Sequence, residues 1–227
     1  MAKTHSVVQT KQNNVVEAVQ TTTVKSPMLW DLDTPNLYTA KTTLIQGDKF
    51  LDSYQTTFGI RTIAYGADFG FKLNGKKTRF KGVCLHHDLG PLGTAVNTRA
   101  TERQLEIMQD MGVNAIRTSH NPPSPEQVQL CDQMGLMIQV EAFDVWQMAK
   151  VENDYSKHFD DWHEEDLRDM IRIFRNSPSV VMWSIGNEIL EQSHNTKGTE
   201  IAKKLVAICK DEDTSRPVSY THLTLPT

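Results

Sequence analysis

Cysteine is scarce in this sequence, and the cysteines that occur are far apart. There are three, Cys84, Cys131 and Cys209, among 227 residues. None belongs to a C-x-x-C pair, and none has a histidine at zinc-finger spacing. An odd number of separated cysteines argues against a disulfide framework and against a zinc site. We therefore expect reduced thiols packed inside a core.

Long apolar runs are also lacking. The longest, such as Val180–Trp183, is far shorter than the roughly 20 residues that cross a bilayer, so no transmembrane helix is expected. The N-terminus continues from Met1 into Lys, Gln and Asn without the apolar stretch of a signal peptide. Because we interpret the chain below as part of a longer protein, both a cytoplasmic and a periplasmic or secreted parent protein fit the sequence.

Neither sign of charge dominates the chain. Lys plus Arg number 24 and Asp plus Glu number 28, a net charge of −4 with neutral histidines, and the two signs are mixed. This pattern argues against a nucleic-acid or membrane-surface partner. No G-x-G-x-x-G loop occurs, and no G-x-x-x-x-G-K string is followed by the Ser or Thr of a phosphate-binding loop, which argues against a nucleotide-binding sheet. With 38% hydrophobic and 23% charged residues, the composition is typical of a folded globular protein.

The first part of the chain, residues 1–66, is expected to be part of a β-sandwich. Residues 38–45 and 50–58 have β-type composition, and the turn residues Gln46 to Lys49 separate them. A third run, residues 60–65, follows Gly59. Short links of this kind are typical of antiparallel strands in a sandwich. The first 23 residues fit either another strand or a frayed end.

The pattern changes after Tyr65. Asn74-Gly75 is flanked by residues 69–73 and 77–80 and predicts a tight hairpin turn, because both positions accept positive φ angles. Short apolar runs then alternate with helical patterns, which predicts a parallel sheet covered by helices. The expected strands are 82–85, 113–118, 136–140 and 180–185, and the expected helices run from 101 to Gly112, from Ser124 to Gly135, over 161–174 and over 199–209.

Polar residues follow each expected strand. They are His86-His87-Asp88, then Ser119-His120-Asn121, then Glu141 with Asp144, then Asn187-Glu188. Functional residues at the C-terminal ends of successive parallel strands are typical of the (β/α)8 TIM barrel. A complete barrel needs about 250 residues, so residues 67–218 are expected to form about four and a half of its eight units.

The segment Trp183-Ser184-Ile185-Gly186-Asn187-Glu188 carries the strongest chemical signal. A carboxyl group at the end of the fourth strand, inside a walled cleft, can act as a general acid toward a leaving oxygen when desolvation raises its proton affinity. A neighbouring amide can hydrogen-bond a substrate hydroxyl. The alternative is that Asn187 and Glu188 only cap the next helix.

Five segments give the chain a resemblance to glycoside hydrolase family 2, and among its members to the β-galactosidase type. In chain order they are Phe58-Gly59-Ile60-Arg61-Thr62, Lys81-Gly82-Val83-Cys84-Leu85-His86-His87-Asp88, Arg117-Thr118-Ser119-His120-Asn121-Pro122-Pro123, Glu141-Ala142-Phe143-Asp144-Val145-Trp146 and Trp183-Ser184-Ile185-Gly186-Asn187-Glu188. The resemblance implies that residues 1–66 are the C-terminal part of an immunoglobulin-like β-sandwich and that the first half of the catalytic barrel follows. It implies a carbohydrate substrate, and a homo-oligomeric parent fits it as well.

The resemblance also implies roles for single residues. Glu188 matches the acid/base glutamate, and Asn187 matches the asparagine that binds the hydroxyl next to the anomeric carbon. His86, His120 and Asn121 match the substrate-binding segments. Three further candidates each have an alternative. Glu141 and Asp144 either touch sugar hydroxyls or pair with Arg117 to orient the site, and Trp146 is either a sugar-stacking platform or a packed aromatic.

No metal or other cofactor is assigned. Large bacterial β-galactosidases of this family carry a Glu-x-His magnesium pair just after the third strand, where this chain has Val145-Trp146-Gln147. The family's nucleophilic glutamate is expected beyond residue 227, so the chain alone is expected to be inactive. Residues 219–227 do not fit the family and are interpreted as a non-native tail.

Three alternative functions remain open at this point. β-Glucuronidase is a relative with a similar scaffold. β-Mannosidase fits less well, because those members lack the paired histidines at His86-His87. A non-catalytic carbohydrate-binding fragment is the alternative from another class of protein.

Overall fold

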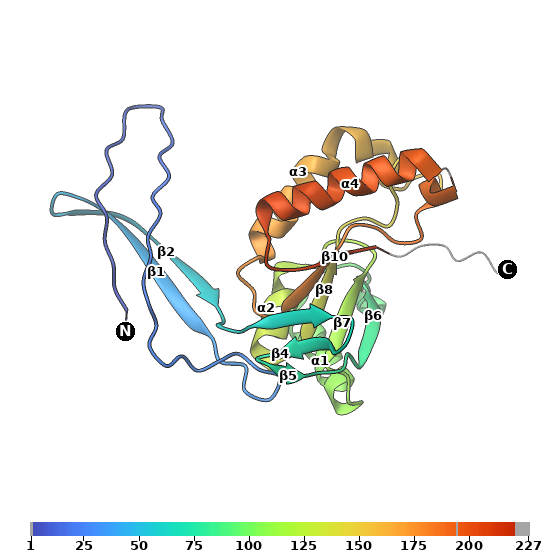
Figure 1. Cartoon of the computed structure of the whole chain (residues 1–227), viewed down its shortest axis with the longest axis horizontal. Helices are drawn as coiled ribbons and strands as arrows, with labels where there is room; N and C mark the ends of the chain where they lie inside the picture. Colours follow the sequence, from blue (N-terminus) through green and yellow to red (C-terminus); the bar gives the residue numbers. More distant parts are fainter. Residues whose placement is uncertain (1, 194, 221–227) are drawn as a thin grey trace.

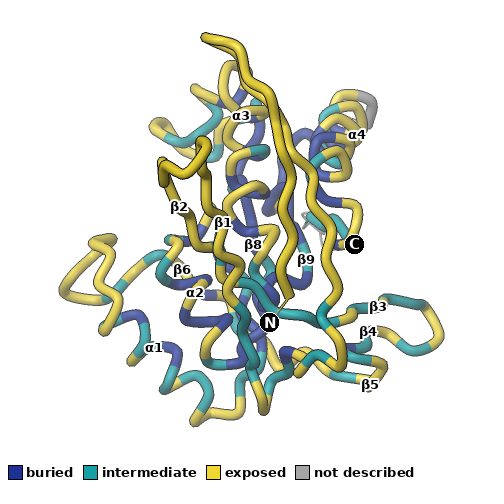
Figure 2. Tube along the Cα trace, turned by 90° about the vertical axis from the view of Figure 1, so that its left-hand side faces the viewer, coloured by how far each residue is buried: buried dark blue, intermediate teal, exposed yellow. Residues whose placement is uncertain are grey.

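The computed structural model describes residues 2–193 and 195–220, which form an N-terminal arm followed by half of an α/β barrel (Figure 1). Residues 2–29 contain no helix or strand, and nearly all of them are exposed (Figure 2). The sequence left open whether the first 23 residues form another strand or a frayed end. Residues 2–23, the described part of that segment, form no strand. The tail prediction falls mostly on residues 221–227, which lie outside the described residues.

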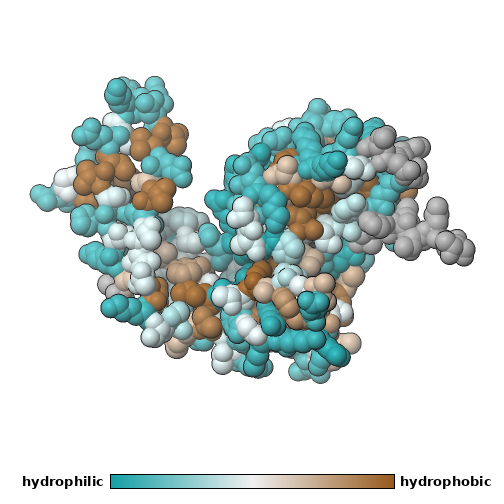
Figure 3. Space-filling model, in the orientation of Figure 1, coloured by the Kyte–Doolittle hydropathy of each residue, from teal (hydrophilic) through white to brown (hydrophobic). Residues whose placement is uncertain are grey.

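The arm ends in an antiparallel hairpin of β1 (Tyr38–Gln46) and β2 (Lys49–Phe58), as expected from the sequence. Gly47 occupies the turn with a φ of 58°, a value that costs a glycine little. Apolar side chains are exposed along the hairpin, and they form part of the hydrophobic surface on the arm in Figure 3. The most exposed are Leu44, Ile45, Phe50 and Tyr54.

The third expected strand of the sandwich pairs elsewhere. β3 (Ile63–Gly66) is antiparallel to β4 (Gly70–Leu73), which pairs with β5 (Lys76–Lys77). Asn74 and Gly75 have φ angles of 50° and 79° in the turn, as their sequence predicts. Among the described residues, this three-stranded sheet is separate from the β1–β2 hairpin.

The small sheet closes the N-terminal end of the half barrel through a cluster that we call the floor cluster. Its buried members are Trp30, Phe71, Leu73, Ala115, Met137 and Val181. The last three lie at or next to the starts of barrel strands, so the sheet covers the strand beginnings. Trp30 is completely buried, and its indole N–H donates to the carbonyl of Asp132 at 2.8 Å. The Tyr65 hydroxyl donates to the carbonyl of Val181 at 2.9 Å.

The barrel half is a parallel sheet in the strand order β10-β9-β8-β7-β6. Its strands are β6 (Gly82–His86), β7 (Ala115–Ser119), β8 (Met137–Glu141), β9 (Val180–Ser184) and β10 (Val218–Ser219). Consecutive strands are neighbours, which is the order of a barrel wall rather than of a doubly wound sheet. The predicted partial TIM barrel after antiparallel strands is thus the observed fold.

Four helices cover the outer face of this sheet: α1 (Thr98–Asp110), α2 (Pro125–Met134), α3 (Ser156–Phe174) and α4 (Asn195–Glu212). α1 begins earlier than the sequence pattern predicts, because the Asn97 side chain caps it by accepting from the Ala100 N–H at 3.0 Å. Ser124 caps α2 in the same way, and Gly135 ends α2 with a φ of 75°. Both α2 signals were visible in the sequence.

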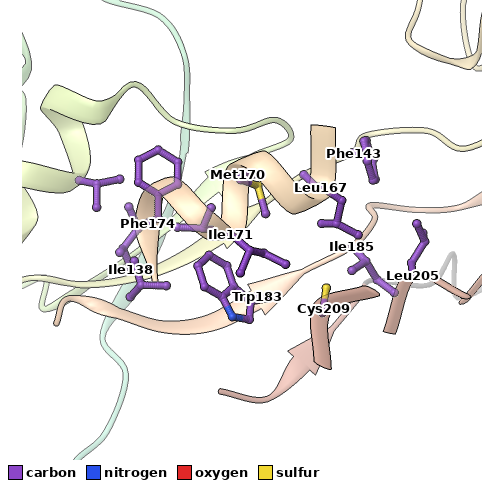
Figure 4. Close-up of a cluster of buried hydrophobic side chains, with 14 of the residues drawn as sticks. Ile138, Phe143, Leu167, Met170, Ile171, Phe174, Trp183, Ile185, Leu205 and Cys209 are labelled. Carbon is purple, nitrogen blue, oxygen red and sulfur yellow. The ribbon is translucent and has the colours of Figure 1, made fainter. Parts of the chain in front are cut away.

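The main hydrophobic core lies between the sheet and its helices, and Figure 4 shows the part of it that α3 and α4 contribute. Leu167, Ile171 and Trp183 are completely buried in it. Cys131 and Cys209 also lie in this core as free thiols, as expected, and burial raises the pKa of Cys209 to about 12. The third thiol differs from the expectation. Cys84 is exposed, because its side of β6 faces away from the helices.

No helix among the described residues is long and apolar enough to span a membrane.

Candidate active site

The C-terminal ends of the parallel strands bring the sequence-predicted residues together. In the sheet register, His86 at the end of β6 lies opposite Ser119 of β7, and Glu141 at the end of β8 lies opposite Ser184 of β9. His120 follows β7, and its ring contacts that of His86 edge-on at 5.3 Å between centroids. The Ser119–His120 peptide bond is cis.

Glu141 is the buried centre of the site. Its side chain is 0% exposed, and both carboxylate oxygens are occupied. Oε1 lies 2.6 Å from Nδ1 of His120, and Oε2 accepts from Nε and Nη2 of Arg117 at 3.0 and 2.7 Å. The Ser184 hydroxyl also donates to Oε2, at 2.5 Å. With its oxygens used in this way, Glu141 is paired with Arg117 and bonded to His120 and Ser184, the arrangement that its second alternative describes.

Arg117 connects Glu141 to Asn187. Its Nη2 donates to the Asn187 Oδ1 at 3.0 Å as well as to Glu141. Partial burial lowers the pKa of Arg117, but the bonds to Glu141 outweigh that effect and hold the pKa above its ordinary value. Because a guanidinium only donates, its contact fixes the Asn187 amide with Oδ1 toward Arg117 and Nδ2 on the other side.

Asp144 receives the other side of that amide. Its Oδ1 accepts from Nδ2 of Asn187 at 3.0 Å and from Nζ of Lys150 at 2.7 Å. Partial burial raises the pKa of Asp144, but the Lys150 and Asn187 hydrogen bonds and the Lys150 charge lower it more, so the pKa lies below its ordinary value. The side chain remains 46% exposed, so Asp144 orients Asn187 and is also within reach of solvent.

Sequence reasoning missed Lys150. Besides bonding the Asp144 carboxylate, its ammonium donates to the carbonyls of Asp144 and Asn187 at 2.9 and 2.8 Å. The residue lies in the loop between β8 and α3, outside every motif, and only the folded chain brings it to the site. Arg117 and Ser184, by contrast, lie inside the quoted motifs, although they were not assigned as site residues.

Glu188 lies beside this network rather than in it. It follows the 5%-exposed Asn187 and is itself exposed, with a left-handed φ of 46°. The walled cleft expected around Glu188 is not formed by the described residues. His86 and Asn121 are also exposed, and all three residues lie at or just beyond the C-terminal ends of barrel strands.

The expectation of a sugar-stacking platform at Trp146 is corrected by the structure. Trp146 is 0% exposed, and its indole N–H donates to the carbonyl of Ile185 at 2.7 Å. Its ring packs near Phe159 and Tyr220 in the core. A buried ring has no face free for a sugar, so Trp146 is the packed aromatic of the two alternatives.

The residues at the family's metal position do not fit a magnesium site. Val145 is apolar and buried, and the Gln147 side chain donates to Asp160. Within residues 2–193 and 195–220, no three His, Cys, Asp or Glu side chains are grouped so that they could hold a metal ion. No chemical step is therefore assigned to a metal here.

A parallel half barrel with polar residues gathered at its C-terminal end is the architecture of the (β/α)8-barrel class of proteins. Sequence models assign the family. The model described as "Glycosyl hydrolases family 2, TIM barrel domain" matches residues 67–225, and "Glycosyl hydrolases family 2" matches residues 1–61. The chain belongs to glycoside hydrolase family 2. The barrel match extends through most of the segment that was interpreted as a non-native tail.

Similar proteins carry two activities in their names. A β-galactosidase of Bacteroides ovatus, BoGH2A, is 50% identical over 202 residues, which cover 89% of this chain and 24% of that protein. A β-glucuronidase of Streptococcus agalactiae is 33% identical over 211 residues, covering 88% of this chain and 35% of that protein. The chain therefore spans about a quarter to a third of the length of these relatives.

Solved structures agree with the fold. A glycosyl hydrolase family 2 member from Bacteroides cellulosilyticus superimposes with a TM-score of 0.85 at 42% identity, covering 88% of this chain and 26% of that one. The β-D-glucuronidase of Dictyoglomus thermophilum gives a TM-score of 0.77 at 29% identity, covering 89% of this chain and 36% of that one.

Proposed function

We propose that the protein to which this chain belongs is a retaining glycosidase that cleaves terminal β-linked sugars, with β-galactosides as its preferred substrates. The observation that carries the proposal is the pairing of Asn187, held by Arg117 and Asp144, with the exposed Glu188 at the end of β9. The 50% identity to a protein named β-galactosidase supports the choice of sugar.

Each residue has a chemical role in this proposal. Glu188 protonates the glycosidic oxygen as it leaves, and its carboxylate later removes a proton from the attacking water. Asn187 hydrogen-bonds the hydroxyl next to the anomeric carbon. His86, His120, Asn121 and Asp144 bind other sugar hydroxyls, whereas Glu141 and Arg117 hold the constellation in place.

We also propose that the chain by itself does not hydrolyse glycosides. A retaining enzyme needs a second carboxylate about 5 to 5.5 Å from the acid/base group, positioned to attack the anomeric carbon. Glu141 does not fit this role, because both of its oxygens are bonded and its side chain is fully buried. Asp144 is held by Lys150 and Asn187. The nucleophile is therefore expected from another part of the protein.

Hydrolysis assays on the full-length protein test the proposal. We expect turnover of 4-nitrophenyl β-galactoside, and we expect Glu188→Gln to abolish turnover of lactose, whose leaving group needs protonation. The same variant should lose much less on 2,4-dinitrophenyl β-galactoside, because that leaving group needs little acid assistance. Equal losses on both substrates would remove Glu188 from the acid role.

β-Glucuronidase is the second candidate, supported by the 33% identity to the Streptococcus agalactiae enzyme of that name. A kcat/KM for 4-nitrophenyl β-glucuronide above that for the galactoside would select it. Both outcomes keep the same acid/base residue, so the Glu188→Gln comparison is repeated on the preferred sugar.

A further inference from the structure

The loop between β8 and α3, residues 142–155, is bonded to the segment that carries Asn187 and Glu188. Trp146 donates to the carbonyl of Ile185 at 2.7 Å, and Lys150 donates to the carbonyl of Asn187 at 2.8 Å. The backbone N–H of Met148 donates to a carboxylate oxygen of Glu191 at 2.6 Å. One loop therefore holds the segment before, at and after Glu188.

Lys150 is the charged member of these contacts, and all its hydrogen-bonding capacity is used. An ammonium group has three donors. Those of Lys150 reach Asp144 Oδ1 at 2.7 Å, Asp144 O at 2.9 Å and Asn187 O at 2.8 Å. No donor is left for a substrate, so Lys150 acts on its protein neighbours. Its side chain is only 21% exposed.

We propose that Lys150 is a positioning residue that fixes the orientation of Glu188 and Asn187 for proton transfer. The proposal rests on the acid/base role of Glu188 described above. The carbonyl that Lys150 binds belongs to the peptide unit that joins Asn187 to Glu188. Its hydrogen bond therefore limits rotation of the backbone immediately before the catalytic carboxylate.

The conformation of Glu188 makes such a restraint necessary. Its φ of 46° is in the left-handed region, which residues with a side chain adopt only where their surroundings hold them. The chain just before Asn187 is glycine, whose backbone is the least restricted, and Gly186 lies close to Ile189 and to the Trp146 indole nitrogen. The bonds from the β8–α3 loop supply the restraint on this segment.

Lys150 also controls the Asn187 side chain through Asp144. Its positive charge helps to hold the pKa of Asp144 below the ordinary value, which keeps this carboxylate ionised as the acceptor for Asn187 Nδ2. The same ammonium therefore orders the backbone and the amide of Asn187.

Hydrogen bonds within the β8–α3 loop fix the position of Lys150. The Asp154 carboxylate accepts from the backbone N–H groups of Lys150 and Val151 at 2.7 and 3.0 Å, and from that of Ser156 at 3.0 Å. These bonds close the loop just before α3 and hold Lys150 at the site.

Kinetics of the full-length enzyme test the proposal. With Lys150→Met, we expect kcat on lactose to fall by about 100-fold while KM changes by less than about threefold, because misplacement of a catalytic group slows chemistry more than binding. The loss on 2,4-dinitrophenyl β-galactoside, or on the glucuronide if that sugar is preferred, should be smaller by at least about tenfold. Lys150→Arg should recover part of the activity.

Two controls separate the possible outcomes. Lys157→Met removes an exposed lysine at the start of α3 that bonds only the Asn153 side chain among the described residues, and it should leave both rates unchanged.

Glu188→Gln must show the leaving-group dependence, and if it does not, the proposed function fails. If Glu188→Gln shows it but Lys150→Met loses both activities equally, or neither, the positioning role is overturned. Should Lys150→Met not fold, Lys150→Arg and addition of ethylammonium to Lys150→Ala provide the same comparison.

Discussion

Arg117 shows how one side chain supports a whole site at the scale of single residues. It holds the buried Glu141 carboxylate and the Asn187 amide at the same time. Glu141 in turn orients His120 and Ser184. Removing the guanidinium would therefore leave a buried charge without its main partner.

We expect Arg117→Met to destabilise the full-length protein by about 3 kcal/mol, the low end for breaking a buried ion pair, because Arg117 is still 19% exposed. Urea denaturation of the variant and the parent measures this difference. Arg99→Met is the matched control. Arg99 pairs with Glu102 and Glu106 on the exposed face of α1, with its own side chain 64% exposed, so its loss should change stability little. Equal effects at both positions would contradict the buried-pair interpretation.

The placement of most candidate site residues could be predicted from the sequence, because they lie at strand ends inside motifs. His86, His120, Glu141, Asn187 and Glu188 all lie at the C-terminal end of the parallel sheet. Lys150 could not be found, since its loop has no local pattern and its partners are set only by folding. Trp146 shows the converse limit: the sequence identifies an aromatic residue but does not decide whether it faces the sugar or the core.

At the scale of elements, the two ends of α2 were more predictable than the partner of β3. Ser124 and Gly135 bound α2 as the sequence indicates, because caps depend on residues a few positions apart. The strand expected over residues 60–65 pairs with β4 rather than with the β1–β2 hairpin. Composition predicts that a strand forms, but its partner depends on which surface the chain must cover.

The end of α2 gives a prediction about glycine. A Cβ on Gly135 would lie 2.2 Å from the Leu32 carbonyl oxygen, whereas a Cβ on Gly112, after α1, meets no atom within 4 Å. Both glycines have positive φ, 75° and 84°. We expect Gly112→Ala to cost about 1 kcal/mol of stability, from backbone strain alone, and Gly135→Ala to cost clearly more. If both variants lost the same stability in thermal or urea unfolding, the backbone at Leu32 would move away from the new Cβ without cost.

The end of α4 gives a prediction about pH. Burial raises the pKa of Asp213, but bonds from Ser215 and Arg216 lower it more, to about 2 from an ordinary 3.8. The folded pKa is depressed, so the carboxylate's contribution to stability is complete above about pH 4 and is lost as pH falls toward 2. We expect the stability difference between the parent protein and Asp213→Asn to shrink over that interval. Urea unfolding at several pH values measures it, and a constant difference would contradict the assignment.

At the scale of the whole molecule, the chain exposes surfaces that folded monomers usually cover. Within residues 2–193 and 195–220, β6 and β10 are the outermost strands of the parallel sheet, and exposed apolar side chains lie along the β1–β2 hairpin (Figure 3). Unpaired strand edges and contiguous apolar surface both favour association with other chains.

We therefore expect the isolated chain to self-associate at micromolar concentration, as measured by analytical ultracentrifugation. The double variant Ile45→Lys with Phe50→Lys should reduce association, because these paired residues are 59% and 61% exposed on the hairpin. Met111→Lys is the control, since this 70%-exposed residue lies apart from the hairpin, after α1. If the unsubstituted isolated chain sediments as a monomer, the exposed surfaces do not drive its self-association.

The floor cluster affects where the chain can be cut between the two regions that the family models match, residues 1–61 and 67–225. Sequence models divide the chain between residues 61 and 67, yet Trp30 lies under the barrel, and Arg61 donates to the carbonyls of Pro178 and Val180. A barrel excised at residue 67 would keep Phe71 and Leu73 but lose Trp30, Arg61 and strand β3, which are part of what covers the starts of its strands. For domain exchange between relatives, the portable unit therefore begins near Met28 rather than at the boundary of the sequence model.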